Sequence, residues 1–175
     1  MNTDFLTPIH TVLEASLDVL LSGSIGSSIQ IYTQKNGFPD LNNIEIAILG
    51  VDEDRNTDDN FGSGKDLHHI RSHFYKLFPG NWNVPIADLG NIKKGETTSD
   101  THFAITEVIK SLLKMNIIPI IIGGGQDITF SNYKAYDQLE QTVNLVVVDS
   151  KFDLGNLEDK LSSKSYLSKI IMEVP

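Results

Sequence analysis

The chain has 175 residues, 40% of them hydrophobic and 21% charged, a composition typical of a globular protein with one core. Its net charge of -9 disfavours binding to a nucleic-acid backbone, and without cysteine it has neither disulfides nor thiolate metal sites. No apolar stretch approaches the roughly 20 residues of a membrane-spanning helix, so we expect no membrane association and a cytoplasmic protein.

Residues 1–43 are predicted to form an N-terminal extension of helix and loop. An amphipathic helix is expected over residues 8–21, followed by a loop rich in Gly, Ser and Asn. Residues 44–175 are predicted to form a second unit, an α/β domain.

From residue 44 onward, short β-branched runs alternate with longer amphipathic segments. This alternation predicts three layers, with helices on both faces of a mostly parallel sheet. The expected strands cover residues 44–51, 84–90, 116–124 and 143–149, and the expected helices lie near 65–77, 100–115, 129–140 and 163–173. The last two strands are almost wholly apolar, which is typical of strands buried on both faces. Ser99 or Asp100 is expected to cap the second of these helices.

Ligand sites in parallel α/β sheets lie beyond the carboxyl ends of the strands, so the segments that follow the strands are the candidates. The loop over residues 52–64 is acidic and could line a pocket through Asn60 and Gly62. A solvated surface loop is the alternative interpretation of the same composition.

A glycine-rich turn follows the third expected strand. Gly124 and Gly125 let the backbone approach a ligand closely, and Asp127 adds a carboxylate, so all three are candidate pocket residues. The turn fails as a dinucleotide-binding motif because Ile128 stands where the last glycine belongs, and no segment has P-loop spacing. A nucleotide-binding module is therefore the weakest alternative function.

Asp149, Lys151 and Asp153 follow the fourth expected strand at spacings of two, which places them on one side of an extended backbone. Two carboxylates that meet in a cleft require a cation. A divalent metal could supply that charge, and so could the ammonium of Lys151.

Other polar residues have plainer interpretations. We expect His102 to be a cap or surface residue at a helix start. Thr129 and Ser131 follow the glycine turn, and we expect capping or hydrogen bonding from them, because no histidine base is predicted nearby.

The order of these motifs resembles the ureohydrolase family, which includes arginases, agmatinases and formimidoylglutamases. The motifs that carry the resemblance cover about residues 44–155 and read ILGVDED, NFGSG, IADLGNI, IIPIIIGGGQDIT and LVVVDSKFD. The resemblance implies the N-terminal half of an arginase-like domain, a pair of Mn²⁺ ions, and hydrolysis of linear amidine or guanidino C–N bonds in a small-molecule substrate. It leaves a homo-oligomer open.

By this resemblance Asp149 and Asp153 retain two metal-binding positions, whereas Gln126 and Lys151 replace histidine ligands. An amide is a weak ligand for manganese, and a lysine is a cation that repels it. The family's later acidic segment is also expected beyond Pro175. We therefore expect a truncated chain with a degenerate site, with manganese weak or absent and no identifiable catalytic residue.

A non-catalytic binding or scaffolding pseudoenzyme is the alternative that these substitutions leave open. In that case Lys151 takes the place of the metal as the counter-charge for the two aspartates.

Overall fold

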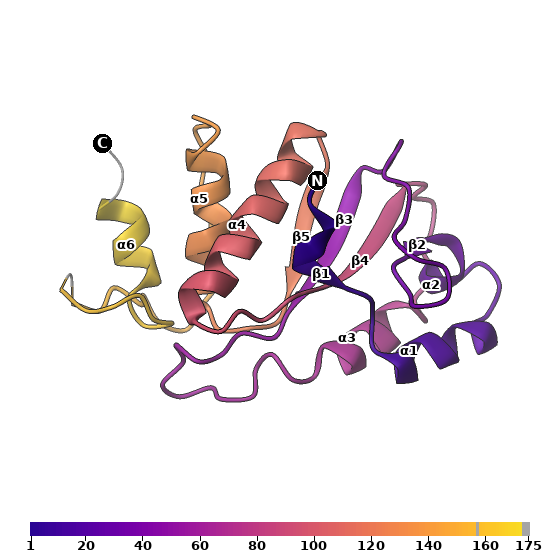
Figure 1. The fold of residues 1–175 in the computed structure, drawn as a ribbon, viewed down its shortest axis with the longest axis horizontal. Helices are drawn as coiled ribbons and strands as arrows, with labels where there is room; N and C mark the ends of the chain where they lie inside the picture. Colours follow the sequence, from indigo (N-terminus) through magenta and orange to yellow (C-terminus); the bar gives the residue numbers. More distant parts are fainter. Residues whose placement is uncertain (157, 173–175) are drawn as a thin grey trace.

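One mixed β-sheet with helices on both faces forms the body of the protein in a computed structural model, which describes residues 1–156 and 158–172 (Figure 1). The strand order is β1-β4-β3-β5, with β2 also paired to β4. The strands are β1 (Leu6–Thr7), β2 (Gln30–Ile31), β3 (Ile46–Val51), β4 (Ile86–Ile92) and β5 (Ile118–Ile122). The α-helices are α1 (Thr11–Ser16), α2 (Ile25–Ser28), α3 (Leu67–Phe74), α4 (Thr98–Lys114), α5 (Ile128–Asp137) and α6 (Tyr166–Met172), and two 3₁₀ turns are η1 (Thr3–Phe5) and η2 (Leu17–Val19).

The central strands run parallel, as predicted. Ala47 of β3 lies opposite Ala87 of β4 on one side and Pro119 of β5 on the other. Among the strands of the described residues, β1 alone runs antiparallel, against the end of β4. The predicted three-layer α/β fold with a mostly parallel sheet is therefore confirmed.

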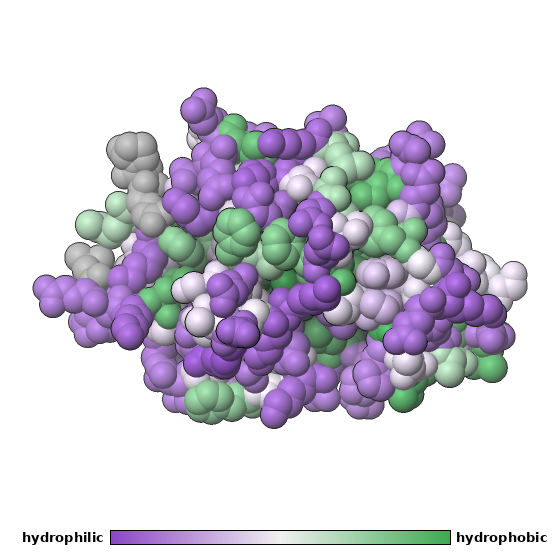
Figure 2. All heavy atoms as spheres, in the orientation of Figure 1, coloured by the Kyte–Doolittle hydropathy of each residue, from purple (hydrophilic) through white to green (hydrophobic). Residues whose placement is uncertain are grey.

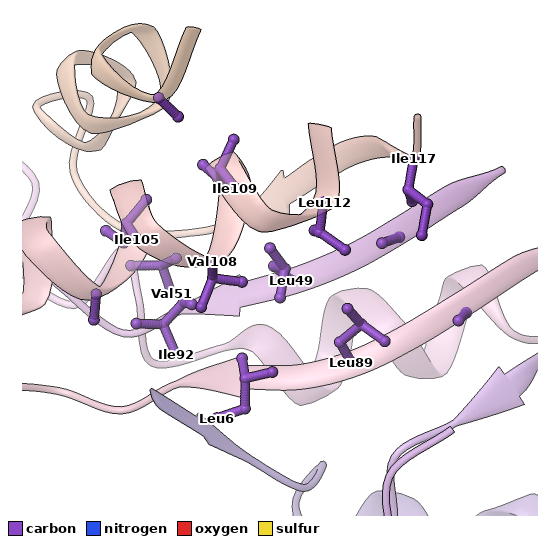
Figure 3. Packing of buried hydrophobic residues seen from close by; sticks show 14 of the residues in the cluster. Leu6, Leu49, Val51, Leu89, Ile92, Ile105, Val108, Ile109, Leu112 and Ile117 are labelled. Atoms are coloured by element: carbon purple, nitrogen blue, oxygen red, sulfur yellow. The ribbon is translucent and has the colours of Figure 1, made fainter. Parts of the chain in front are cut away.

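The core lies between α4 and the sheet (Figure 3). Ile105, Ile109 and Leu112 recur at the spacing of one helix face and are buried in one cluster with Leu49 of β3 and Leu89 of β4. Burial of such side chains stabilises the fold by about 1.5–3 kcal/mol each. This packing fixes the orientation of β3 and β4, and with it the position of their carboxyl ends.

A buried ion pair holds α3 against the opposite face of the sheet. The guanidinium of Arg71 in α3 donates from Nε to Asp88 Oδ2 of β4 at 2.7 Å, and both side chains are buried. Tyr75 Oη donates to the same carboxylate oxygen at 2.8 Å. Because a buried carboxylate needs such donors, the helix and the strand are fixed to each other.

Two local expectations about helices were wrong. The helix expected over residues 8–21 is the short α1 followed by η2. The cap of α4 is Thr97, whose hydroxyl accepts from the Asp100 amide, while the Asp100 carboxylate accepts from the Thr97 amide. Asp100 is therefore the reciprocal partner in a capping box, and Ser99 has no part in it.

The segment 143–149 was expected to be a buried strand and is neither a strand nor buried. The side chain of Val146 is 84% exposed and that of Val148 is 98% exposed. An apolar β-branched run forms a strand only where a neighbouring strand accepts its backbone hydrogen bonds, and no strand in residues 1–156 and 158–172 pairs with this segment.

Candidate functional site

An open pocket of about 190 Å³ lies where the chain leaves the carboxyl ends of β3 and β5. Its lining residues come from the loop after β3, the glycine turn after β5, and the segment that precedes α6, which meet near the lower end of α5 (Figure 1). They are Thr57, Asp58, Asp59, Asn60, Gly124, Gly125, Gln126, Asp149, Ser150, Lys151, Asp153, Ser163 and Lys164. The position agrees with the general rule for ligand sites in parallel sheets.

Most of the residues proposed from the sequence meet in this pocket, namely Asn60, Gly124, Gly125, Gln126, Asp149, Lys151 and Asp153. Gly62 and Asp127 are not part of its lining. The amide of Gly62 instead donates to Asp54 Oδ2 at 2.5 Å, and Asp127 is fully buried behind the pocket wall.

The glycine turn brings its backbone against the loop after β3. Gly124 has a φ of 82°, in the left-handed region that favours glycine. A Cβ at Gly125 would lie 2.4 Å from both Thr57 Cγ2 and Asp127 Oδ1, so no side chain fits there. The amide of Gly125 donates to the carbonyl of Glu53 at 2.7 Å. The turn thus fixes the next residue, Gln126, at the pocket.

Gln126 and Asp149 contact each other directly. Gln126 Nε2 donates to Asp149 Oδ2 at 2.5 Å, and the amides of Ser150 and Lys151 donate to Asp149 Oδ1 at 2.6 and 3.3 Å. The hydrogen bond from Gln126 is the main cause that lowers the pKa of Asp149 below its ordinary value. Asp149 is therefore an ionised carboxylate with donors on both oxygens.

Asp153 has the opposite shift. Burial, followed by hydrogen bonding to Asp149 and repulsion from its charge, raises the pKa of Asp153, while Lys151 and Lys164 act to lower it. Two neighbouring carboxyl groups that shift in opposite directions hold one negative charge more readily than two.

The lysines of the pocket lie at different distances from its carboxylates. Lys164 Nζ is 2.9 Å from Asp59 Oδ2 and 3.5 Å from Asp58 Oδ2, so it holds the loop after β3. Lys151 contacts Asp149 through its backbone amide. Among the residues that the structure describes, no ion pair within 4.0 Å joins the Lys151 ammonium to Asp149 or Asp153.

The side chains that line the pocket include four aspartates and no histidine. Within residues 1–156 and 158–172, no three side chains of His, Cys, Asp or Glu are grouped so that they could hold one metal ion. Gln126 directs an N–H donor at Asp149 Oδ2, whereas a metal ligand at position 126 would have to offer a lone pair.

A buried group behind the pocket was missed from the sequence. His102 was expected to be a cap or surface residue, and this is wrong, because its ring lies between Ser131 Oγ at 2.5 Å and Asp127 Oδ2 at 3.0 Å. The hydrogen bonding expected of Ser131 is confirmed, but the expectation that no histidine lies near it is wrong. The only available signal was the position of His102 next to Thr101 on the apolar face of α4.

Residues 44–173 match the sequence family described as the arginase family. The chain belongs to this family. It is 31% identical over 122 residues to a formimidoylglutamase from Macrococcus caseolyticus, an alignment that covers 65% of this chain and 38% of that protein. A formimidoylglutamase from Streptococcus gordonii is 27% identical over 122 residues, covering 63% of this chain and 36% of the relative.

Solved structures of arginase-family proteins share the fold. Formimidoylglutamase from Bacillus subtilis superposes with a TM-score of 0.68 at 21% identity, covering 79% of this chain and 46% of that structure. The Trypanosoma cruzi formiminoglutamase with Mn²⁺ superposes with a TM-score of 0.63 at 20% identity, covering 77% and 49%. The chain thus spans between about a third and half of the length of these relatives.

No helix within the described residues is both long enough and apolar enough to cross a lipid bilayer.

Proposed function

We propose that this arginase-family chain forms one half of a formimidoylglutamase-like or arginase-like site whose dinuclear manganese centre is degenerate. The names of its relatives support the substrate class, a small molecule with a linear amidine or guanidino C–N bond. The relatives extend well beyond the matched region, so the activity of the whole protein is part of the proposal.

The hydrogen bond from Gln126 to Asp149 carries this proposal. The resemblance places a histidine at position 126, and a neutral imidazole offers a lone pair to a metal. The Gln126 amide group instead directs an N–H at the carboxylate, which ties up the Asp149 oxygen nearest to it. The hydrogen bond satisfies this carboxylate oxygen without a cation, so binding of manganese would stabilise the pair little.

A non-catalytic binding protein is the second candidate, and the charges of the pocket favour it. Four lining carboxylates, on Asp58, Asp59, Asp149 and Asp153, share the pocket with the ammonium groups of Lys151 and Lys164. Both lysines act to lower the pKa of Asp153, as a metal ion would. A pocket with charges of both signs can bind a zwitterionic ligand without hydrolysing it.

Metal titration of the full-length protein tests the degenerate centre. We expect it to bind less than two equivalents of Mn²⁺ and to release neither formamide from a formimidoyl substrate nor urea from a guanidino substrate. Two tightly bound equivalents together with product release would overturn the proposal.

A double variant, Gln126→His with Lys151→His, restores both imidazole positions and removes one positive charge. We expect its Mn²⁺ affinity to rise by about tenfold or more, because even outer partners of metal ligands change affinity by about 10–100-fold. Gln141→His with Lys160→His makes the same chemical change at exposed positions outside the pocket and serves as the control. Equal affinities in the two double variants would show that residues 126 and 151 do not determine metal binding.

A further inference from the structure

Asp127 lies directly behind the pocket wall and has no exposed surface. Its Oδ2 accepts from His102 Nε2 at 3.0 Å and from Asn56 Nδ2 at 3.1 Å, and its Oδ1 accepts from Ser163 Oγ at 3.4 Å. These three donors come from α4, the loop after β3 and the segment before α6. One buried carboxylate therefore joins three parts of the chain that are distant in sequence.

Two of the joined segments, the loop after β3 and the segment before α6, also form part of the pocket, as does the glycine turn that precedes Asp127. The loop after β3 supplies residues 57–60, the glycine turn supplies 124–126, and the third segment supplies Ser163 and Lys164. The amide of Ser163 donates to the carbonyl of Asn56 at 3.1 Å, which closes the contact between two of the walls. Loss of the carboxylate would leave these partly buried donors without an acceptor, which is unfavourable.

The ring of His102 extends this network to α5. An ionised carboxylate only accepts hydrogen bonds, so the nitrogen that faces Asp127 carries a proton, and the other nitrogen faces Ser131 Oγ at 2.5 Å. The serine, histidine and aspartate follow one another as in a hydrolytic triad, but the ring is reversed, because Nδ1 faces the serine and Nε2 faces the aspartate. Ser131 is only 1% exposed and lies within α5, so its hydroxyl meets no substrate, and the arrangement orients groups without attacking them.

We propose that Asp127, oriented by His102 and Ser131, is the positioning residue that assembles the pocket and holds Gln126 against Asp149. Asp127 follows Gln126 directly, and the tight fit of Gly125 against Asp127 and Thr57 leaves the turn no other path. Pocket geometry is thus set by a buried carboxylate that touches no ligand. The proposal concerns the order of the pocket and does not depend on whether the chain hydrolyses a substrate.

Asp127→Asn tests this, because it keeps the shape of the side chain, removes its charge and replaces one acceptor with a donor. Amide hydrogen exchange is measured at Gly125 and Ser163, which donate to Glu53 and Asn56, and at Ile109 and Leu112 in the core of α4. We expect exchange at the two pocket amides to accelerate at least tenfold relative to the core amides. The NMR signal of the Gln126 side-chain amide is expected to move toward the position of a solvated amide. Asp137→Asn, at the half-exposed last residue of α5, is the matched control and should change none of these signals.

Two outcomes with Asp127→Asn would overturn the proposal. Equal acceleration at the pocket and core amides would mean that Asp127 contributes only to global stability. Unchanged exchange at Gly125 and Ser163, with an unchanged Gln126 signal, would mean that the pocket is held without it. A second variant, His102→Gln, keeps a donor toward Asp127 and is expected to show a smaller effect in the same direction. A larger effect than that of Asp127→Asn would place the histidine, and not the carboxylate, at the centre of the network.

Discussion

Glu53 and Arg55 are a pair of charged residues that fix the start of the loop after β3. The Glu53 side chain is fully buried, and Arg55 donates to it from Nη2 at 2.5 Å, from Nε at 2.9 Å and from its backbone amide at 3.1 Å. Arg55 also donates to the carbonyls of Gly95 and Glu96, which precede α4. Burial of Glu53 alone would raise its pKa, but the hydrogen bonds from Arg55 outweigh it and lower the pKa to about 2.

This shift predicts a loss of stability in acid. The pKa of Glu53 is about 2 in the folded protein and 4.5 when the residue is unperturbed, so the unfolded chain takes up the proton first as the pH falls. The stabilisation is therefore present above pH 4.5 and is lost between pH 4.5 and 2, at most about 3 kcal/mol in total. Urea unfolding at pH 6 and pH 3 measures it. Glu53→Gln should lower the free energy of unfolding at pH 6, and its free energy of unfolding should differ less between pH 6 and pH 3 than that of the unmodified protein. Glu45→Gln, at an exposed position before β3, is the control and should behave like the unmodified protein. The same pH dependence in Glu53→Gln and the unmodified protein would assign the acid sensitivity to other groups.

Gln126 could be located from the sequence because the glycine turn follows β5, whose apolar run marks a strand. Asp149 and Asp153 were expected after a fourth strand that the structure does not form, yet the structure brings all three residues into one pocket. The contact between His102 and Asp127 could not be found, because it joins residues 25 positions apart and depends on how α4 docks beside the glycine turn. Side-chain contacts of that kind follow from packing, which no local pattern encodes.

Among the elements, α4 has the clearest start signal. Thr97 and Asp100 exchange hydrogen bonds in a capping box, and the Thr97 hydroxyl accepts from the Asp100 amide at 3.2 Å. These bonds satisfy amides that the first helical turn leaves without partners. Because α4 supplies much of the core, its start matters for the whole sheet.

Thr97→Ala is expected to lower the free energy of unfolding by about 1 kcal/mol, since it removes the capping hydroxyl. Ser99→Ala removes a hydroxyl two residues later, at an exposed position without a capping bond, and should stay within about 0.5 kcal/mol of the unmodified protein. Urea unfolding of both variants separates the two positions. Equal losses would show that the box does not stabilise the helix.

The regular elements were predictable where pattern and partner agree. Strands β3, β4 and β5 fall within or overlap their predicted ranges because each has a neighbour that completes its hydrogen bonds. The apolar segment 143–149 has the same pattern but no pairing strand within the described residues, and it remains outside the sheet. An apolar β-branched pattern indicates that a segment can form a strand, and the segment does so only where another strand is placed to pair with it.

At the scale of the whole molecule, apolar side chains remain at the surface along one end of the sheet. Ile118 of β5 is 61% exposed and Ile120 is 45% exposed, and their side chains lie on the face opposite Ile121, which packs on the core. The backbone amide of Ile118 donates to the carbonyl of Glu45, on the side of β5 that faces β3. Backbone N–H and C=O groups alternate in direction along a strand, so those of Ile121 point to the free edge of β5. Figure 2 shows apolar surface between hydrophilic residues on one face as well. An open edge beside exposed apolar side chains favours association with other chains.

We therefore expect the 175-residue chain to self-associate at micromolar concentrations, where exposed strand edges and apolar surface drive aggregation. A charged side chain on the exposed surface of β5 opposes self-association, because each copy of the chain would have to bury that charge in the contact. The variant Ile120→Lys should be more monomeric in sedimentation velocity at every concentration. Val12→Lys, an equally large change at an exposed position on α1, controls for net charge, because one lysine there lies away from the β5 edge. If Val12→Lys reduces self-association as much as the substitution on β5 does per added charge, then the overall charge of -9, and not the β5 edge, determines self-association.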